Sequence, residues 1–133
     1  MVTLYHYTLL RNVQSILQSG LWASIRIEGK PETDAVQGNG QYFTDTKPVE
    51  AQAFPREDIA QAFFDIRLRW GVTGSPEQIA WIEVVLEDTR AEHVADLYDG
   101  ALKATLPNRG IWLHRATTSL PPRFIANWGI LKV

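Results

Sequence analysis

The chain has 133 residues and a mass of 15.0 kDa, and we expect a single domain over residues 1–133 rather than a multi-domain assembly. Its net charge is -2 at pH 7, from 13 Lys and Arg against 15 Asp and Glu, so it lacks the basic excess of a sequence-independent nucleic-acid binder. The absence of cysteine excludes a disulfide framework, a thiolate metal site and a cysteine nucleophile.

The N-terminal residues predict a strand that is followed directly by a helix. Residues 2–8 are rich in Val, Thr and Tyr, which favour a strand. Thr8 is placed to cap the helix that follows, and Gly20 is placed to end it. One face of this helix is indicated by apolar residues at positions i, i+4, i+7 and i+8, namely Leu9, Val13, Ile16 and Leu17.

The next part of the chain predicts two strands separated by a polar loop. Residues 22–27 favour a second strand. Residues 28–39 are polar and contain Gly29, Pro31 and Gly38, so we expect a surface loop of the length that often carries function. Residues 40–44 (GQYFT) predict a short strand.

Two helices and a loop are predicted after this strand. A brief helix is expected within residues 48–54, before Pro55. A second helix is expected from Pro55 to about Leu68, because acidic residues occupy its first turn and its apolar residues share one face. Those apolar residues are Ile59, Phe63 and Ile66. Residues 71–76 are expected to form a loop.

The C-terminal part predicts three further strands. Residues 79–87 (IAWIEVVLE) give the strongest strand pattern, with Ala80, Ile82, Val84 and Leu86 on one side and Trp81, Glu83, Val85 and Glu87 on the other. Residues 88–109 give an ambiguous pattern, for which we expect at most a short helix over 91–97. Residues 111–115 and 124–133 predict closing strands separated by a Pro-Pro turn. Few helices and no regular βαβ alternation predict an α+β fold.

Several kinds of chemistry lack their motifs in this sequence. No GxGxxG follows a predicted strand, and neither a Walker loop nor a GxSxG elbow occurs. His6, His93 and His114 lack the spacing that places metal ligands on one helix face, so no metal is expected. No apolar run approaches the roughly 20 residues that cross a bilayer, so we expect a soluble chain without a membrane partner.

Two short segments combine hydrogen-bonding and aromatic side chains, residues 4–8 (LYHYT) and 38–45 (GNGQYFTD). Either a flat aromatic ligand or an ordinary sheet interior, with half-buried tyrosines and a core histidine, accounts for such segments. Together with the helix end at 17–21 (LQSGL), they resemble the HYD1-type ADP-ribosyltransferase toxin domains. These domains share the broad fold of diphtheria toxin and the poly(ADP-ribose) polymerases, and the resemblance is close over the first third of the chain.

The resemblance implies an ADP-ribosyltransferase-like split β-sheet with a few short helices and a cleft for NAD between its halves. In this family the bond between nicotinamide and ribose in NAD breaks through an oxocarbenium-like state. The resemblance places His6 on the adenosine-side ribose and the backbone of Tyr7 on the nicotinamide amide, with Thr8 as a further polar contact. It also implies that the Tyr42 ring stacks on nicotinamide and that Phe54 forms a second aromatic wall, although Phe54 fits a core residue equally well.

The third residue of the family signature is an acid, and its position in this chain is open. Related transferases place Glu on a late strand, but residues 109–114 read RGIWLH and contain no acid. Asp45 is the first candidate by its order along the chain, and Asp99 and Glu83 are the substitutes. The alternative for Asp45 is a surface residue that caps a turn.

The expected function is therefore NAD-dependent mono-ADP-ribosylation of a macromolecule, with a protein as the favoured acceptor. The resemblance implies a bacterial toxin or effector that is delivered into the cytoplasm of a target cell and countered by an immunity protein. One alternative is a catalytically silent domain of the same fold that binds ADP-ribose or a protein. Another is an enzyme that modifies DNA or RNA, which the slightly acidic charge argues against.

Overall fold

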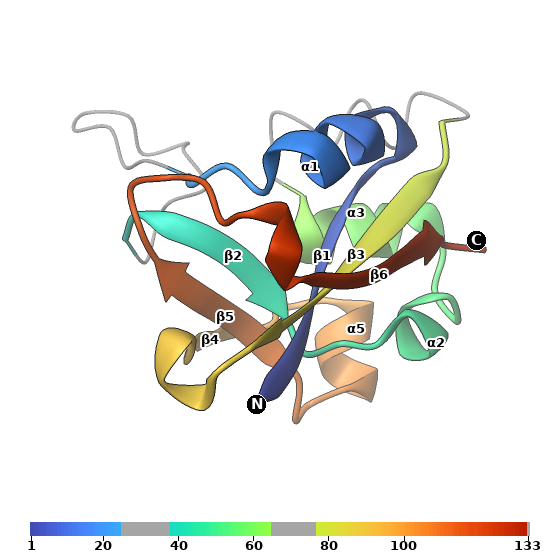
Figure 1. Ribbon diagram of the computed structural model, residues 1–133. Coiled ribbons are helices and arrows are strands. Elements are labelled where there is room, and N and C mark those ends of the chain that lie inside the picture. The colour runs from blue at the N-terminus through green and yellow to red at the C-terminus, as the bar shows by residue number, and fades with distance from the viewer. Residues whose placement is uncertain (25–37, 65–76, 133) are drawn as a thin grey trace, which may run out of the picture.

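The computed structural model describes residues 1–24, 38–64 and 77–132 and has an α+β architecture (Figure 1). Its strands form one six-stranded sheet in the order β4-β5-β2-β1-β3-β6, and every pair of neighbours is antiparallel. The strands are β1 (Val2–Leu9), β2 (Gly40–Thr44), β3 (Ile79–Leu86), β4 (Glu92–Asp96), β5 (Gly110–Arg115) and β6 (Ile125–Ile130).

Short helices cover both faces of the sheet. The α-helices are α1 (Val13–Ser19), α2 (Pro48–Ala51), α3 (Arg56–Phe63) and α5 (Ala101–Thr105), and the 3-10 turns are η1 (Leu10–Asn12), η2 (Asp88–Arg90) and η3 (Pro122–Phe124). Residues of α1 and η3 pack on one face, and residues of α2 and α3 pack on the other. In Figure 1, α1 and η3 lie in front of the sheet and α3 and α5 lie behind it.

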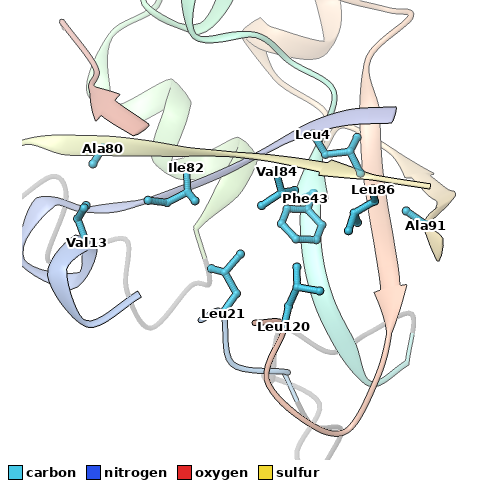
Figure 2. Close-up of a cluster of buried hydrophobic side chains, with 10 residues drawn as sticks. All are labelled: Leu4, Val13, Leu21, Phe43, Ala80, Ile82, Val84, Leu86, Ala91 and Leu120. Carbon is cyan, nitrogen blue, oxygen red and sulfur yellow. The ribbon is translucent and has the colours of Figure 1, made fainter. Parts of the chain in front are cut away.

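The alternation of side chains along β3 divides the core between these two faces. On one side of β3, the apolar residues Ala80, Ile82, Val84 and Leu86 are fully buried. They pack with Leu4 of β1 and Phe43 of β2, and Figure 2 shows this cluster with Leu21 and Leu120 closing it from the loops. Tyr7 and Leu9 of β1 belong to the cluster on the opposite face. The two-sided pattern predicted for residues 79–87 is therefore confirmed.

The sheet consists of two groups of three strands that meet at a single residue pair. β1 pairs with β3 along its whole length, from Val2 to Leu9, and β2 pairs with β5 from Gly40 to Thr44. Between β1 and β2, the registered Cα partners are Tyr5 and Thr44 alone. Figure 1 shows the two groups diverging from this junction. We call β1, β3 and β6 the first group and β2, β5 and β4 the second group.

Most of the predicted elements are confirmed, but the first helix begins differently from the expectation. Thr8 lies inside β1 instead of capping a helix, and its Oγ1 accepts a hydrogen bond of 3.1 Å from Asn12 Nδ2. The chain first forms the 3-10 turn η1 and then α1. Gly20 ends α1 as predicted, with a φ of 86°, a conformation that favours glycine.

The short helix expected within residues 91–97 is wrong. Residues Glu92–Asp96 form the edge strand β4, which pairs with β5 and has an irregularity between His93 and Ala95. Pairing with an existing strand outweighs the weak local preference of this polar segment. The helix of this region lies later in the chain, at α5.

Several other expectations fall partly or wholly outside the described residues. These are residues 25–27 of the strand expected at 22–27, most of the loop at 28–39, residues 65–68 of the helix expected to reach Leu68, and the loop at 71–76. The expected end of that helix is wrong, because α3 ends at Phe63 and Phe64 already has an extended backbone. Next to residues 25–27, Leu21 and Ser24 form isolated bridges with Leu120 and Gly40. Within the described part of the chain, no helix is long and apolar enough to span a membrane.

Candidate functional site

His6 lies on the diverging side of the junction between β1 and β2. Its ring is half-buried, and Nδ1 lies 3.3 Å from the backbone oxygen of Tyr42. Because a carbonyl oxygen only accepts hydrogen bonds, Nδ1 carries the proton and Nε2 is the acceptor nitrogen of the neutral ring. The ring also meets the edge of Phe43, with centroids 6.4 Å apart. His6 is thus held in one orientation by the opposite group of strands.

Tyr42 meets His6 through its backbone. The side chains of β2 alternate, so the Tyr42 ring leaves the strand on the side opposite to Phe43. Its hydroxyl donates a hydrogen bond of 2.5 Å to the backbone oxygen of Gly38. The structure therefore brings the backbones of the two signature segments together. It does not bring the rings of His6 and Tyr42 together, because they lie on opposite faces of β2.

Tyr7 is a buried packing residue. Its ring stacks on Phe63 with centroids 4.8 Å apart, and its hydroxyl donates a hydrogen bond of 2.8 Å to the backbone oxygen of Thr46. Burial is the main cause that raises the pKa of Tyr7, and the nearby Tyr5 and the charge of Glu50 add to it. The Tyr7 hydroxyl therefore stays protonated and links β1 to the segment after β2.

Thr8 and Phe54 also have structural contacts. Thr8 is buried, and its hydroxyl accepts the hydrogen bond from Asn12 described above. Phe54 follows α2 and is half-buried against two apolar clusters, which include Phe63 and Leu102. These contacts account for a packing role of Phe54, and a ligand contact stays a prediction for both residues.

The three acids considered for the third signature position have different surroundings. Asp45 accepts a hydrogen bond of 2.9 Å from the backbone N–H of Gly110, and so fastens the end of β2 to the start of β5. Glu83 accepts a hydrogen bond of 3.2 Å from the Tyr5 hydroxyl. Asp99 has a side chain that is 95% exposed and pairs with Lys103 on the surface.

Glu50 and Arg109 form an ion pair that the sequence analysis did not identify. Arg109 Nη2 lies 2.9 Å and Nε lies 3.3 Å from Glu50 Oε2, and the exposed fractions of the two side chains are 29% and 23%. Glu50 Oε1 accepts the backbone N–H of Lys47 at 2.9 Å. Burial acts to raise the pKa of Glu50, but the hydrogen bonds from Arg109 and Lys47 outweigh it and hold the pKa below its usual value.

A second polar contact joins β2 to β5 on the face that carries α1. The Gln41 amide nitrogen donates to the backbone oxygens of Leu21 and Thr118, at 3.0 and 2.8 Å. Its Oε1 therefore accepts, and it receives a hydrogen bond of 2.7 Å from Nδ1 of His114. Burial lowers the pKa of His114, and the nearby charge of Arg90 lowers it further.

We expect His114 to make the stability of the chain depend on pH. The folded chain binds a proton at His114 less readily than the unfolded chain, so this contribution is complete above about pH 6.5 and is lost as the pH falls below that value. The variant His114→Gln keeps an N–H donor for Gln41 but does not titrate. The free energy of unfolding is measured by urea unfolding at about pH 7.5 and at about pH 5. Between these two values it should fall less in His114→Gln than in the unmodified chain. Equal losses in the two proteins would contradict this.

Within the described residues, no group of three or more His, Asp or Glu is placed to hold a metal ion. Comparison of the chain with protein-family models, with curated proteins and with solved structures finds no match.

Proposed function

We propose that this chain is an NAD-dependent mono-ADP-ribosyltransferase, whose two groups of strands correspond to the halves of an ADP-ribosyltransferase-like split sheet. The observation that supports the proposal most is the hydrogen bond from His6 to the backbone oxygen of Tyr42. It joins the two segments that carry the family resemblance at the point where β1 and β2 diverge. In the proposal, NAD binds across this point.

The proposed reaction transfers ADP-ribose to a nucleophile of the acceptor. The bond between C1′ of the ribose and the nicotinamide nitrogen breaks, and its electron pair leaves with nicotinamide. The acceptor nucleophile forms the new bond at C1′ and releases its proton. In this scheme Nε2 of His6 accepts a hydrogen bond from a ribose hydroxyl, because Nδ1 carries the proton that faces Tyr42. In this scheme the backbone of Tyr7 contacts the nicotinamide. The ring of Tyr42 reaches it only by leaving its hydrogen bond to Gly38, since the ring lies on the face of β2 opposite to His6.

The proposed biological role is that of a bacterial toxin or effector domain. A protein is the favoured acceptor, since the net charge of -2 offers little attraction to the phosphates of a nucleic acid. A chain that modifies proteins in this way requires protection of the producing cell, and the proposal includes an immunity protein for that purpose.

A catalytically silent domain that binds ADP-ribose or a protein is the second candidate. One specific observation favours it, because β5, the late strand next to β2, carries no carboxylate. The candidate acid on the Tyr42 segment, Asp45, is bound to the backbone of Gly110. In this alternative the divergence of β1 and β2 serves binding alone.

Incubation of the purified chain with NAD labelled on its adenylate half, in a bacterial lysate, tests the proposal. We expect a labelled protein band that is absent when the chain is omitted and that resists nuclease treatment. Label in a nuclease-sensitive species would assign a nucleic acid as the acceptor, and free ADP-ribose alone would assign NAD hydrolysis. NAD that binds to the chain but stays intact would favour the silent domain and would contradict the proposed transfer.

A further inference from the structure

We infer that Arg90 and Arg123 form a binding site for a phosphate group. The inference goes beyond the proposed function, because neither His6 nor Tyr42 belongs to this site. Two turns that are far apart in the sequence supply the arginines. Arg90 ends η2, and Arg123 lies in η3.

Both guanidinium groups pack against one aromatic ring. The Cζ atoms of Arg90 and Arg123 lie 5.2 and 4.9 Å from the centre of the Phe124 ring. Both are within cation–π range of the same ring centre, so the two Cζ atoms are at most about 10 Å apart. Phe124 and Ala91, which follows Arg90, pack in the same apolar cluster, where Figure 2 shows Ala91. The cluster therefore anchors both turns beneath the two exposed charges.

The guanidinium groups of Arg90 and Arg123 have no hydrogen-bond acceptor among the described residues. The other four described arginines donate to an oxygen of the protein, namely Arg11, Arg56, Arg109 and Arg115. A guanidinium that packs on an aromatic ring keeps its N–H donors at its edge. The two arginines without an acceptor are therefore also the two that share one ring.

The acids near Arg90 in the sequence do not neutralise it. Asp88 pairs with the N-terminal amine, and Glu92 pairs with Arg115. Glu87 is exposed and forms no ion pair within the described part of the chain. Two like charges held at one ring repel each other, and a bound anion offsets this repulsion.

A phosphate group fits this arrangement better than a carboxylate does. The two oxygens of a carboxylate are matched by the fork of a single guanidinium. A phosphate group has more acceptor oxygens and a greater negative charge, so two arginines can bind it together. A diphosphate extends this reach further.

His114 provides a probe of the site that is independent of catalysis. Its pKa is lowered mainly by burial, and the charge of Arg90 lowers it further. A phosphate group bound at Arg90 offsets that charge. Occupation of the site should therefore raise the pKa of His114.

Binding of inorganic pyrophosphate at low salt tests the inference. Its Kd is measured by calorimetry, and the pKa of His114 by NMR of the imidazole with and without pyrophosphate. Arg123→Gln removes one arginine of the site and leaves Arg90 beside His114. Arg11→Gln is the matched control, because it removes the same charge from an exposed arginine that pairs with Glu77.

We expect pyrophosphate to bind the unmodified chain and to raise the pKa of His114. Arg123→Gln should weaken the binding at least about tenfold, whereas Arg11→Gln should keep Kd within about twofold. Absence of pyrophosphate binding, equal losses in the two variants, or a pKa of His114 that pyrophosphate leaves unchanged would overturn the inference. Thermal unfolding of both variants checks that the fold is kept.

A second ligand distinguishes the sources of the phosphate group. ADP-ribose carries the diphosphate that is also present in NAD. If Arg123→Gln weakens the binding of ADP-ribose as well as that of pyrophosphate, the site holds the diphosphate of such a nucleotide. If ADP-ribose binding is absent or unchanged while pyrophosphate binding is lost, the site takes a separate phosphate ligand. Both results support the inference, and neither depends on cleavage of NAD, so the proposed function is tested separately.

Discussion

Replacing His6 with alanine is expected to lower NAD turnover at least about a hundredfold, while the free energy of unfolding falls by only about 1 kcal/mol. The loss of turnover follows from the proposed contact between Nε2 and a ribose hydroxyl. The small change in stability follows from the half-buried position of the ring, which makes a hydrogen bond of 3.3 Å to Tyr42 and an edge contact with Phe43. Turnover and urea unfolding are measured on the same preparation.

His6→Asn is the matched control for this prediction. The asparagine amide nitrogen occupies nearly the same place as Nδ1 and can donate to the Tyr42 oxygen, but nothing replaces Nε2. We therefore expect stability close to that of the unmodified chain together with the same loss of turnover. Turnover retained in His6→Asn would contradict the assignment of Nε2. A loss of stability of about 3 kcal/mol in His6→Ala, without loss of turnover, would indicate a core histidine.

Replacing Gly20 with alanine is expected to destabilise the chain by about 3 kcal/mol or more. Gly20 has a φ of +86°, and a Cβ built there would lie 2.0 Å from the backbone oxygen of Leu120. That oxygen accepts the backbone N–H of Leu21, and Leu21 receives the N–H of Leu120 in return. The added carbon would force these two loops apart and would open the cluster that Leu21 and Leu120 close in Figure 2.

Gly100→Ala is the control, since it adds the same methyl group where only ordinary van der Waals contacts await it. Gly100 precedes α5 with an extended backbone, and a Cβ there would lie 3.4 Å from the side chain of Gln61. We expect a change of less than about 1 kcal/mol. Thermal and urea unfolding of both variants would check the difference, and equal stabilities would show that the segment around Leu120 relaxes freely.

An element could be predicted where the spacing of its own apolar residues shows which of its faces is buried. The alternation along β3 and the apolar face formed by Val13, Ile16 and Leu17 of α1 are properties of nearby residues, and both are observed. The sequence pattern predicts Leu9 on the same helix face, but it lies in β1 and packs on the opposite side of the sheet. The strand β4 has no such pattern, because its residues Glu92, His93 and Asp96 are all exposed. It is a strand because β5 offers an edge to pair with, and that edge exists only once the sheet has formed.

For the candidate site too, local segments could be predicted and long-range contacts could not. The segments around His6 and Tyr42 are recognisable because each keeps its characteristic residues within a few positions. Glu50 could have been noticed from its place three residues after Lys47, at the start of a short helix that begins with proline. Its pairing with Arg109 could not be predicted, since the two residues are 59 positions apart and meet only in the folded chain.

Because β1 and β2 share a single registered pair, the two groups of strands are joined by few backbone contacts. The ladders between β1 and β3 and between β2 and β5 are continuous, whereas β1 and β2 share one registered pair, so a change in the angle between the groups breaks few backbone hydrogen bonds. Two side-chain hydrogen bonds also join the groups of strands. They run from the His6 ring to the backbone oxygen of Tyr42 and from the Tyr7 hydroxyl to the backbone oxygen of Thr46. Two residues proposed to hold NAD, His6 and Tyr7, therefore also set the angle between the halves, so a bound ligand and a change in that angle affect the same two hydrogen bonds.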